Sequence, residues 1–263
     1  MRNTVLYGDC RQTLQQIAQS GDKARMCVTS PPYYGLRDYG KEDDQIGLEE
    51  SPEEFIDQLV EVFRGVRDCL TDDGTLWVNI GDSYYNYRGG KGQALPKQSV
   101  ATTNQDLPQG KNPRRGNKLK GYKEKDLIGI PWMLAFALRK DGWYLRQDII
   151  WSKPNPMPES VRDRCTKSHE YIFLLSKSQN YYFDVNSIKV PTVDGNQLKR
   201  RKSVWEVKTK PYKGAHFAVY PSELIIPRIL AGSEEGDIIL DPFMGSGTTA
   251  AVAKSLKRDY LGC

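Results

Sequence analysis

The sequence predicts an α/β fold in which helices cover a mainly parallel β-sheet. Short apolar runs of strand length alternate with helical patterns along the chain, which is typical of such sheets. Near the C-terminus a glycine-rich turn joins a buried strand to a helix. The length of 263 residues suits one core with a small appended lobe rather than two full-sized domains.

The first half of the chain gives the clearest elements. Strands are expected at residues 5–7 and 26–28, with a helix at 13–20 between them. The next helix starts at Ser51 and Pro52, a capping residue followed by proline at the first helical position. Its apolar residues share one face: Phe55, Leu59, Phe63, Val66 and Leu70. Residues 71–74 (TDDG) should end it, and a strand should follow at 76–80.

Residues 84–120 show no periodic apolar pattern and are rich in Gly, Pro, Gln, Asn and basic residues, so we expect a mobile basic loop there. Regular elements then resume along the chain. We expect helices at 131–140, 222–230 and 248–257, and strands at 144–151, 171–175 and 237–240. The basic stretch 196–213 has little apolar content.

The net charge of +5 is mild, but the basic residues are clustered. Residues 111–125 and 199–213 each carry seven Lys or Arg against one Glu, with Tyr122, Trp205 and Tyr212 among them. Such clusters favour a nucleic-acid surface, although solvated loops are the alternative. The residues expected to contact nucleic acid are Arg114, Arg115, Lys118, Lys199, Arg200, Arg201 and Lys202.

Other features exclude several classes of protein. The five cysteines form no C-x-x-C pair and no cluster with histidine at metal-ligand spacing, so we expect free thiols and no metal. His169 and His216 are expected to be packed or hydrogen-bonded rather than catalytic. No apolar run is long enough to span a bilayer and no secretory signal is evident, so we expect a cytoplasmic protein without a membrane partner.

The segment 237–249 (DIILDPFMGSGTT) reads as a buried strand, a glycine-rich turn and a helix start. Glycines let a ligand lie against bare backbone, and a helix N-terminus offers N–H groups to an anion. An ordinary tight turn is the alternative. Asp241 at the end of the strand and Phe243 before the glycines favour S-adenosyl-L-methionine (AdoMet), and Ala250 stands where a dinucleotide fingerprint prefers its third glycine.

A second motif, Ser30-Pro31-Pro32-Tyr33, follows the strand predicted at 26–28. Two prolines hold the backbone extended, so the Ser30 hydroxyl and the Pro31 carbonyl can face one point while Tyr33 stacks on a planar group. Ser-Pro-Pro also occurs in ordinary loops. At the carboxyl end of a parallel strand, where open α/β sheets bind their ligands, the motif favours a functional site.

These two motifs make the chain resemble the β group of amino-methylating DNA methyltransferases. In that group a catalytic (D/N/S)-P-P-(Y/F/W) motif precedes the F-x-G-x-G motif that binds AdoMet, the circularly permuted order seen here. Further segments match in order: GDC at 8–10, WSKPNPMP at 151–158 and HFAVYPSEL at 216–224. Together they cover nearly the whole chain.

The resemblance implies a Rossmann-like, AdoMet-dependent methyltransferase fold with a small target-recognition insertion. It divides the chain into a catalytic half (1–158), a target-recognition segment (159–213) and an AdoMet-binding half (214–263). Asp9 and Cys10 would lie near the adenine, Asp241, Phe243, Gly245 and Gly247 near the methionine end, and Ser222 or Glu223 would cover that end. The rest of the expected cofactor site is Thr29, Pro242, Ser246 and Thr248.

The resemblance implies a site-specific enzyme that acts on double-stranded DNA, and it leaves a homodimer open. The acid that binds the ribose in this family normally follows the strand after the glycine motif, and the sequence reaches Cys263 where that acid is expected next. The resemblance therefore implies either a chain that continues beyond this point or compromised ribose binding in this polypeptide.

The expected reaction is methylation of an exocyclic amino group on a flipped-out base. Ser30 Oγ and the Pro31 carbonyl would accept the amino hydrogens, Pro32 would stiffen the loop and Tyr33 would stack on the base. Because Ser at the first motif position is typical of cytosine-N4 enzymes, N4 is favoured over adenine N6. Methylation at cytosine C5 is disfavoured because no cysteine follows a proline. The alternatives are a DNA-binding relative without catalysis, and methylation of RNA or of a protein glutamine amide.

Overall fold

A computed structural model describes residues 1–35, 45–85, 119–210 and 220–263. Its five helices in these ranges are α1 (Cys10–Gln19), α2 (Pro52–Cys69), α3 (Ile130–Lys140), α4 (Ser222–Gly232) and α5 (Thr248–Ser255). The strands are β1 (Thr4–Val5), β2 (Ala24–Thr29), β3 (Leu70–Ile80), β4 (Tyr144–Ser152), β5 (His169–Ser176), β6 (Val190–Pro191), β7 (Leu198–Lys199), β8 (Val204–Glu206), β9 (Ile238–Asp241) and β10 (Asp259–Gly262).

Eight of the strands form one sheet in the order β1-β10-β9-β2-β3-β5-β4-β8. Neighbours from β1 to β3 run parallel, β5 is antiparallel to both β3 and β4, and β8 runs parallel to β4. The predicted α/β class with a mainly parallel sheet is therefore confirmed.

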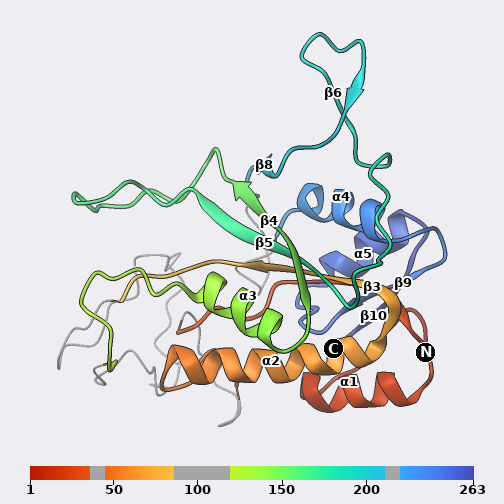
Figure 1. The fold of residues 1–263 in the computed structure, drawn as a ribbon, viewed down its shortest axis with the longest axis horizontal. Helices are drawn as coiled ribbons and strands as arrows, with labels where there is room; N and C mark the ends of the chain where they lie inside the picture. The colour runs from red at the N-terminus through yellow and green to blue at the C-terminus, as the bar shows by residue number, and fades with distance from the viewer. Residues whose placement is uncertain (36–44, 86–118, 211–219) are drawn as a thin grey trace, which may run out of the picture.

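Helices cover both faces of this sheet (Figure 1). Helices α1, α2 and α3 lie side by side on one face, and α4 and α5 lie on the other. Because successive side chains of a strand point to opposite faces of the sheet, alternate residues pack against the two helix layers. In β3, Leu76 and Val78 join the core beneath α1–α3, whereas Trp77 joins the core beneath α4 and α5.

The sequence located most elements but missed the start of β3 and the four short strands β6, β7, β8 and β10. Residues 71–74, expected to end a helix, are part of β3, because Leu70 already pairs with Ala24 and the ladder shifts register before Met26. Strands β8 and β10 were not expected. Each has at most four residues and is defined by pairing with a distant neighbour rather than by a local pattern.

Strand β5 lies within the stretch predicted as the target-recognition segment (159–213). It occupies the central sheet between β3 and β4, so residues 169–176 are part of that sheet. The two-stranded hairpin of β6 and β7 projects from the body (Figure 1). The loop expected at 84–120 falls almost wholly on residues 86–118, which lie outside the described ranges.

Candidate active site

The two motifs meet where β2 and β9 lie next to each other. These strands come from opposite ends of the chain, yet Cys27 pairs with Leu240. The carboxyl end of β2 leads into Ser30–Tyr33, and that of β9 leads into the glycine turn. In open α/β sheets such a junction of non-consecutive strands is the usual place for a ligand.

Asp241 ties the two motifs together. Its buried carboxylate accepts hydrogen bonds from Thr29 Oγ1 (2.6 Å) and the Phe243 amide (3.0 Å) on one oxygen, and from Thr249 Oγ1 (2.6 Å) and the Tyr220 hydroxyl (3.1 Å) on the other. Burial raises the pKa of Asp241 above its ordinary value, and the four donors oppose that rise. Its carboxylate therefore organises the loops around it.

Tyr220 is part of this cluster and was not singled out from the sequence. Its hydroxyl lies 2.6 Å from Thr249 Oγ1 and also reaches Asp241. It directly precedes Pro221 and α4. The signal that pointed to it was its place within the HFAVYPSEL segment, in which the resemblance implied roles only for Ser222 and Glu223.

The glycine turn has the shape that the AdoMet prediction requires. Gly245 and Gly247 have positive φ angles of 54° and 81°, which favour glycine, and a Cβ on Gly247 would meet nothing within 4 Å. Helix α5 starts directly after Gly247, and no side chain caps its N-terminus. Amide groups at such a helix start suit a carboxylate, so the turn fits the methionine end of AdoMet.

The remaining predicted cofactor residues of the turn surround this helix start. Pro242 is buried and Phe243 is half-buried. The hydroxyls of Ser246 and Thr248 are hydrogen-bonded to each other at 3.1 Å, beside the first turn of α5. The structure thus groups these residues at one edge, and their contacts with a cofactor remain predictions.

Asp9 and Cys10 lie at the end of β1, at the same edge of the sheet. Asp9 caps α1 by accepting the Arg11 amide at 2.7 Å, and it also pairs with the Arg11 guanidinium, which lowers the pKa of Asp9. Burial raises the pKa of the Cys10 thiol to about 12 and that of Cys263 to about 11, so both thiols are protonated near neutral pH. In the sheet order they stand beyond β10 from the glycine turn.

Ser222 and Glu223 form the first turn of α4. The Ser222 hydroxyl donates to the Glu223 carboxylate at 3.2 Å, and that carboxylate forms an ion pair with Lys210. Glu223 is exposed, and its pKa is lowered by the contact with Lys210. That either side chain covers the methionine end of AdoMet remains a prediction.

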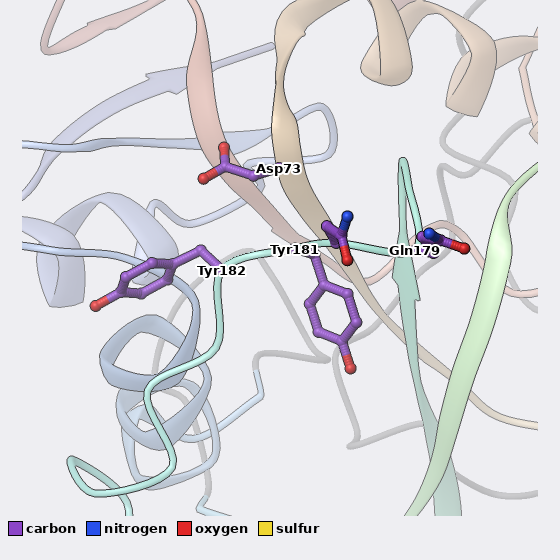
Figure 2. Close-up of a pocket in the computed structure, with 5 residues that line it drawn as sticks. Asp73, Gln179, Tyr181 and Tyr182 are labelled. Atoms are coloured by element: carbon purple, nitrogen blue, oxygen red, sulfur yellow. The ribbon is translucent and has the colours of Figure 1, made fainter.

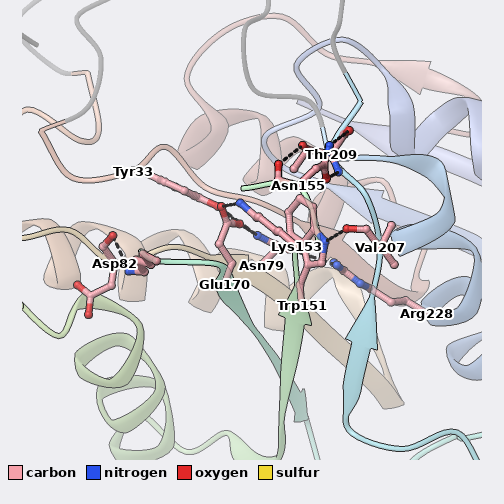
Figure 3. Close-up of polar contacts among 11 residues, drawn as sticks. Tyr33, Asn79, Asp82, Trp151, Lys153, Asn155, Glu170, Val207, Thr209 and Arg228 are labelled. Carbon is pink, nitrogen blue, oxygen red and sulfur yellow. Dashed lines mark hydrogen bonds and ion pairs between the residues drawn. The ribbon is translucent and has the colours of Figure 1, made fainter. Parts of the chain in front are cut away.

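The second motif places Tyr33 in a buried polar network (Figure 3). Its hydroxyl donates to Glu170 Oε2 at 2.6 Å and accepts from Asn79 Nδ2 at 3.1 Å. Burial raises the pKa of Tyr33 well above its ordinary value, the Glu170 carboxylate adds to the rise, and a hydrogen bond with the Ser30 side chain opposes it. Ser30 itself is half-buried, whereas Pro31 is buried.

Four residues of this network were missed by sequence reasoning. Asn79 Nδ2 donates to Glu170 at 2.7 Å, Lys153 forms an ion pair with Glu170, and Arg228 Nη2 donates to Asn79 Oδ1 at 3.3 Å. Two sequence signals pointed to this network: Glu170 directly precedes the apolar run at 171–175, and Arg228 is the single basic residue of α4.

Trp151 is a core residue at the end of β4. It is only 4% exposed, and its Nε1 donates to the Val207 carbonyl at 2.8 Å. Just beyond it, Asn155 Nδ2 donates to the Thr209 carbonyl, and the Thr209 amide donates back to Asn155 Oδ1. These bonds fasten the segment after β8 to the segment after β4 (Figure 3).

The predicted DNA contacts fall into two groups. Arg114, Arg115 and Lys118 lie outside the described residues. In the other group, Arg200 and Lys202 are exposed and Lys199 is half-buried at the end of β7. Arg201 instead faces the protein: its guanidinium lies 5.3 Å from the Trp205 ring and donates to the Ile188 carbonyl at 3.4 Å.

A separate hollow of about 420 Å³ lies at the opposite edge of the sheet (Figure 2). It is lined by Asp73, Gln179, Asn180, Tyr181 and Tyr182, next to the start of β3 and the end of β5, far from the two motifs.

Within the described ranges, no group of three or more His, Cys, Asp or Glu side chains could hold a metal ion. No helix in those ranges is long and apolar enough to cross a membrane.

Comparison with known proteins agrees with this geometry. Residues 24–263 match the DNA methylase family of N6/N4 methyltransferases. The chain is 49% identical to the type II methyltransferase M.Cfr9I of Citrobacter freundii, over 98% of this chain and 82% of that protein. It is 50% identical to the type II methyltransferase M.SmaI of Serratia marcescens, over 98% of this chain and 85% of that protein.

Solved structures share the fold at lower identity. The cytosine-N4-specific PvuII DNA methyltransferase superposes with a TM-score of 0.68 at 17% identity, over 100% of this chain and 81% of that one. A putative DNA modification methylase from Thermus thermophilus, complexed with S-adenosyl-L-methionine, gives 0.64 at 23% identity, over 99% of this chain and 86% of that one. The expected methyltransferase fold is confirmed. The chain therefore belongs to the N6/N4 family of DNA methylases, the AdoMet-dependent enzymes that methylate amino groups of DNA bases.

Proposed function

We propose that this chain methylates the N4 amino group of cytosine in double-stranded DNA at a specific site. The observation that carries the proposal is Ser30 at the first position of the catalytic motif, at the end of β2 and beside the Tyr33 hydroxyl. Ser at this position is typical of cytosine-N4 enzymes in the family that the chain resembles. The PvuII enzyme, which shares the fold, is cytosine-N4-specific.

The loop formed by Ser30–Tyr33 would act by aligning the amino nitrogen of the base for methyl transfer. An exocyclic amino nitrogen is a poor nucleophile because its lone pair is delocalised into the ring. Ser30 Oγ and the Pro31 carbonyl would accept the two amino hydrogens, which localises the lone pair on nitrogen. Tyr33 would stack on the flipped base, and holding the base in line supplies much of the rate.

AdoMet, when bound, supplies the electrophilic methyl group. The chain's own part is to hold it next to the amino nitrogen. The glycine turn and the start of α5 would bind its methionine end, and Asp9 and Cys10 would lie near its adenine. Because Asp241 bonds both Thr29 and the Phe243 amide, one buried carboxylate would fix the spacing between the cofactor loop and the catalytic loop.

The assignment of the target base is tested by identifying the methylated base that the protein forms in DNA. DNA methylated by the purified protein should yield N4-methylcytosine when its nucleosides are separated and identified by mass spectrometry. N6-methyladenine without N4-methylcytosine would overturn the assignment to cytosine and leave amino methylation intact. No methylated base in DNA, with methyl transfer to RNA or to a glutamine amide, would overturn the choice of substrate.

We further propose that the hairpin of β6 and β7, with the basic residues that follow it, contacts the DNA. A two-stranded ribbon fits the major groove, and Arg200 and Lys202 at its base are free to reach phosphates. Residues 111–125, which carry the other basic cluster, would add phosphate contacts. This assigns target recognition to the projecting part of the segment after β5.

Replacing Lys199, Arg200 and Lys202 together with alanine should weaken DNA binding and flatten its salt dependence. Each phosphate that the variant no longer neutralises should reduce the slope of log affinity against log salt by about 0.9. The measurement is a salt titration of DNA affinity, with Lys140→Ala and Lys254→Ala as exposed basic controls on the helices of the two faces. An unchanged slope would show that these residues do not touch the backbone of DNA.

A further inference from the structure

The carboxylate of Glu170 gathers three donors from three separate parts of the chain. Oε2 accepts the Tyr33 hydroxyl at 2.6 Å and Asn79 Nδ2 at 2.7 Å, and Oε1 forms the ion pair with Lys153. Glu170 is the second residue of β5 and pairs with Trp151 in the sheet. Its side chain is only 14% exposed, so its oxygens face these donors rather than solvent.

The Tyr33 ring is held from a second side by Gly81. A Cβ added to Gly81 would lie 2.7 Å from Tyr33 Cε2, which is closer than real contacts allow. The ring edge therefore packs directly on backbone, while the hydroxyl is anchored at Glu170. With both ends fixed, the orientation of the ring is set before any base arrives.

We infer that Glu170 is a positioning residue of the methyltransferase site: through the Tyr33 hydroxyl it fixes the ring against which the target base stacks. The inference rests on the proposed function, because it assigns the stacking role to Tyr33. Glu170 does not touch the reacting atoms in this arrangement. It acts through Tyr33.

A carboxylate suits this position better than its amide. Glutamine would offer one acceptor oxygen to three donors and would turn its own N–H groups toward one of them. The negative charge also faces two cations, the half-buried Lys153 and the buried Arg228. Among the described residues, Arg228 Nε and Nη1 have no hydrogen-bond partner. Apart from the Glu170 carboxylate, the network therefore offers little that balances the positive charge of Arg228.

The experiment is a double-mutant cycle of Glu170→Gln and Tyr33→Phe in the full chain. Tyr33→Phe removes the hydroxyl and keeps the ring. We expect each single variant to lower kcat by at least about tenfold and to change the AdoMet dissociation constant and the KM for DNA less than twofold. The double variant should be no slower than the slower single variant, because both cut the same bond.

Glu235→Gln is the matched control, since Glu235 is an exposed carboxylate paired with Lys257 and not joined to Tyr33. It should keep the kcat of the original protein. If Glu170→Gln does not fold, Glu170→Asp tests the same contact, because it keeps the charge and withdraws the carboxylate by one methylene. It should show the same selective loss of kcat.

Full kcat in Glu170→Gln or Glu170→Asp, or losses that simply multiply in the double variant, would overturn the inference. So would a loss of AdoMet affinity as large as the loss of kcat, which would indicate general damage to the fold. Failure of the proposed function looks different, because the unchanged protein would then form N6-methyladenine in place of N4-methylcytosine, or would methylate no DNA.

Discussion

Replacing Ser30 with alanine should abolish methyl transfer and leave AdoMet binding intact. In the proposed mechanism the Ser30 hydroxyl accepts one amino hydrogen of the base, and alanine cannot. Losing one hydrogen bond worth about 1.4 kcal/mol in the transition state already costs a factor of ten, and misalignment of the nitrogen adds to it. The expected loss in kcat is therefore well over tenfold.

The cofactor should still bind because the groups proposed to hold it belong to other elements. The glycine turn follows β9, and Asp241 is anchored to Thr29 rather than to Ser30. Calorimetry of AdoMet binding and incorporation of a labelled methyl group into DNA would measure the two effects separately. Ser255→Ala, an exposed serine at the end of α5, serves as the control. Unchanged turnover in Ser30→Ala would defeat the mechanism.

The parts of the fold that the sequence predicted are those with a local pattern. Helix α2 has a capping residue, a first-turn proline and one apolar face, and it was located from these alone. Strand β10 has four residues and forms because Leu261 pairs with Leu240 and Thr4 on its two sides. No window of sequence contains that information, so the strand was missed.

The candidate site also consists of local motifs, which the sequence predicted, and of residues that only the fold brings together. The Ser-Pro-Pro-Tyr loop and the glycine turn are contiguous and were found as motifs. Glu170, which lies 137 residues from Tyr33, becomes a neighbour only because β5 enters the sheet antiparallel to β3 and brings its first residues to the catalytic edge. The direction and position of β5 were not predictable from its own eight residues, so its acidic residue could not be assigned to the site.

Asp241→Ala should destabilise the protein and weaken AdoMet binding together. The buried carboxylate satisfies the hydroxyls of Thr29, Thr249 and Tyr220 and the amide of Phe243. Each buried donor left without a partner costs about 1–3 kcal/mol, although Tyr220 and Thr249 can still bond to each other. We therefore expect a loss of about 3–5 kcal/mol in the free energy of unfolding.

Asp241→Asn separates the hydrogen bonds from the charge. Asparagine keeps one oxygen for Thr29 and the Phe243 amide, and the paired hydroxyls can reorient, so the loss of stability should be smaller than with alanine. Burial raises the pKa of Asp241 in the folded protein above its value of 3.8 in the unfolded chain. The folded state thus binds the proton more tightly, and this residue makes the original protein lose stability as the pH rises through the interval above 3.8. Asp241→Asn should lack that contribution.

Urea unfolding at several pH values and calorimetry with AdoMet would measure both variants. In Asp241→Ala the Phe243 amide of the glycine turn and the Thr29 hydroxyl of β2 both lose the carboxylate to which they donate, so AdoMet affinity should fall by at least about tenfold. In Asp241→Asn the affinity should lie between those of Asp241→Ala and the original protein. An Asp241→Ala protein as stable as the original, with unchanged AdoMet affinity, would show that the carboxylate neither supports the core nor sets the spacing of the two loops.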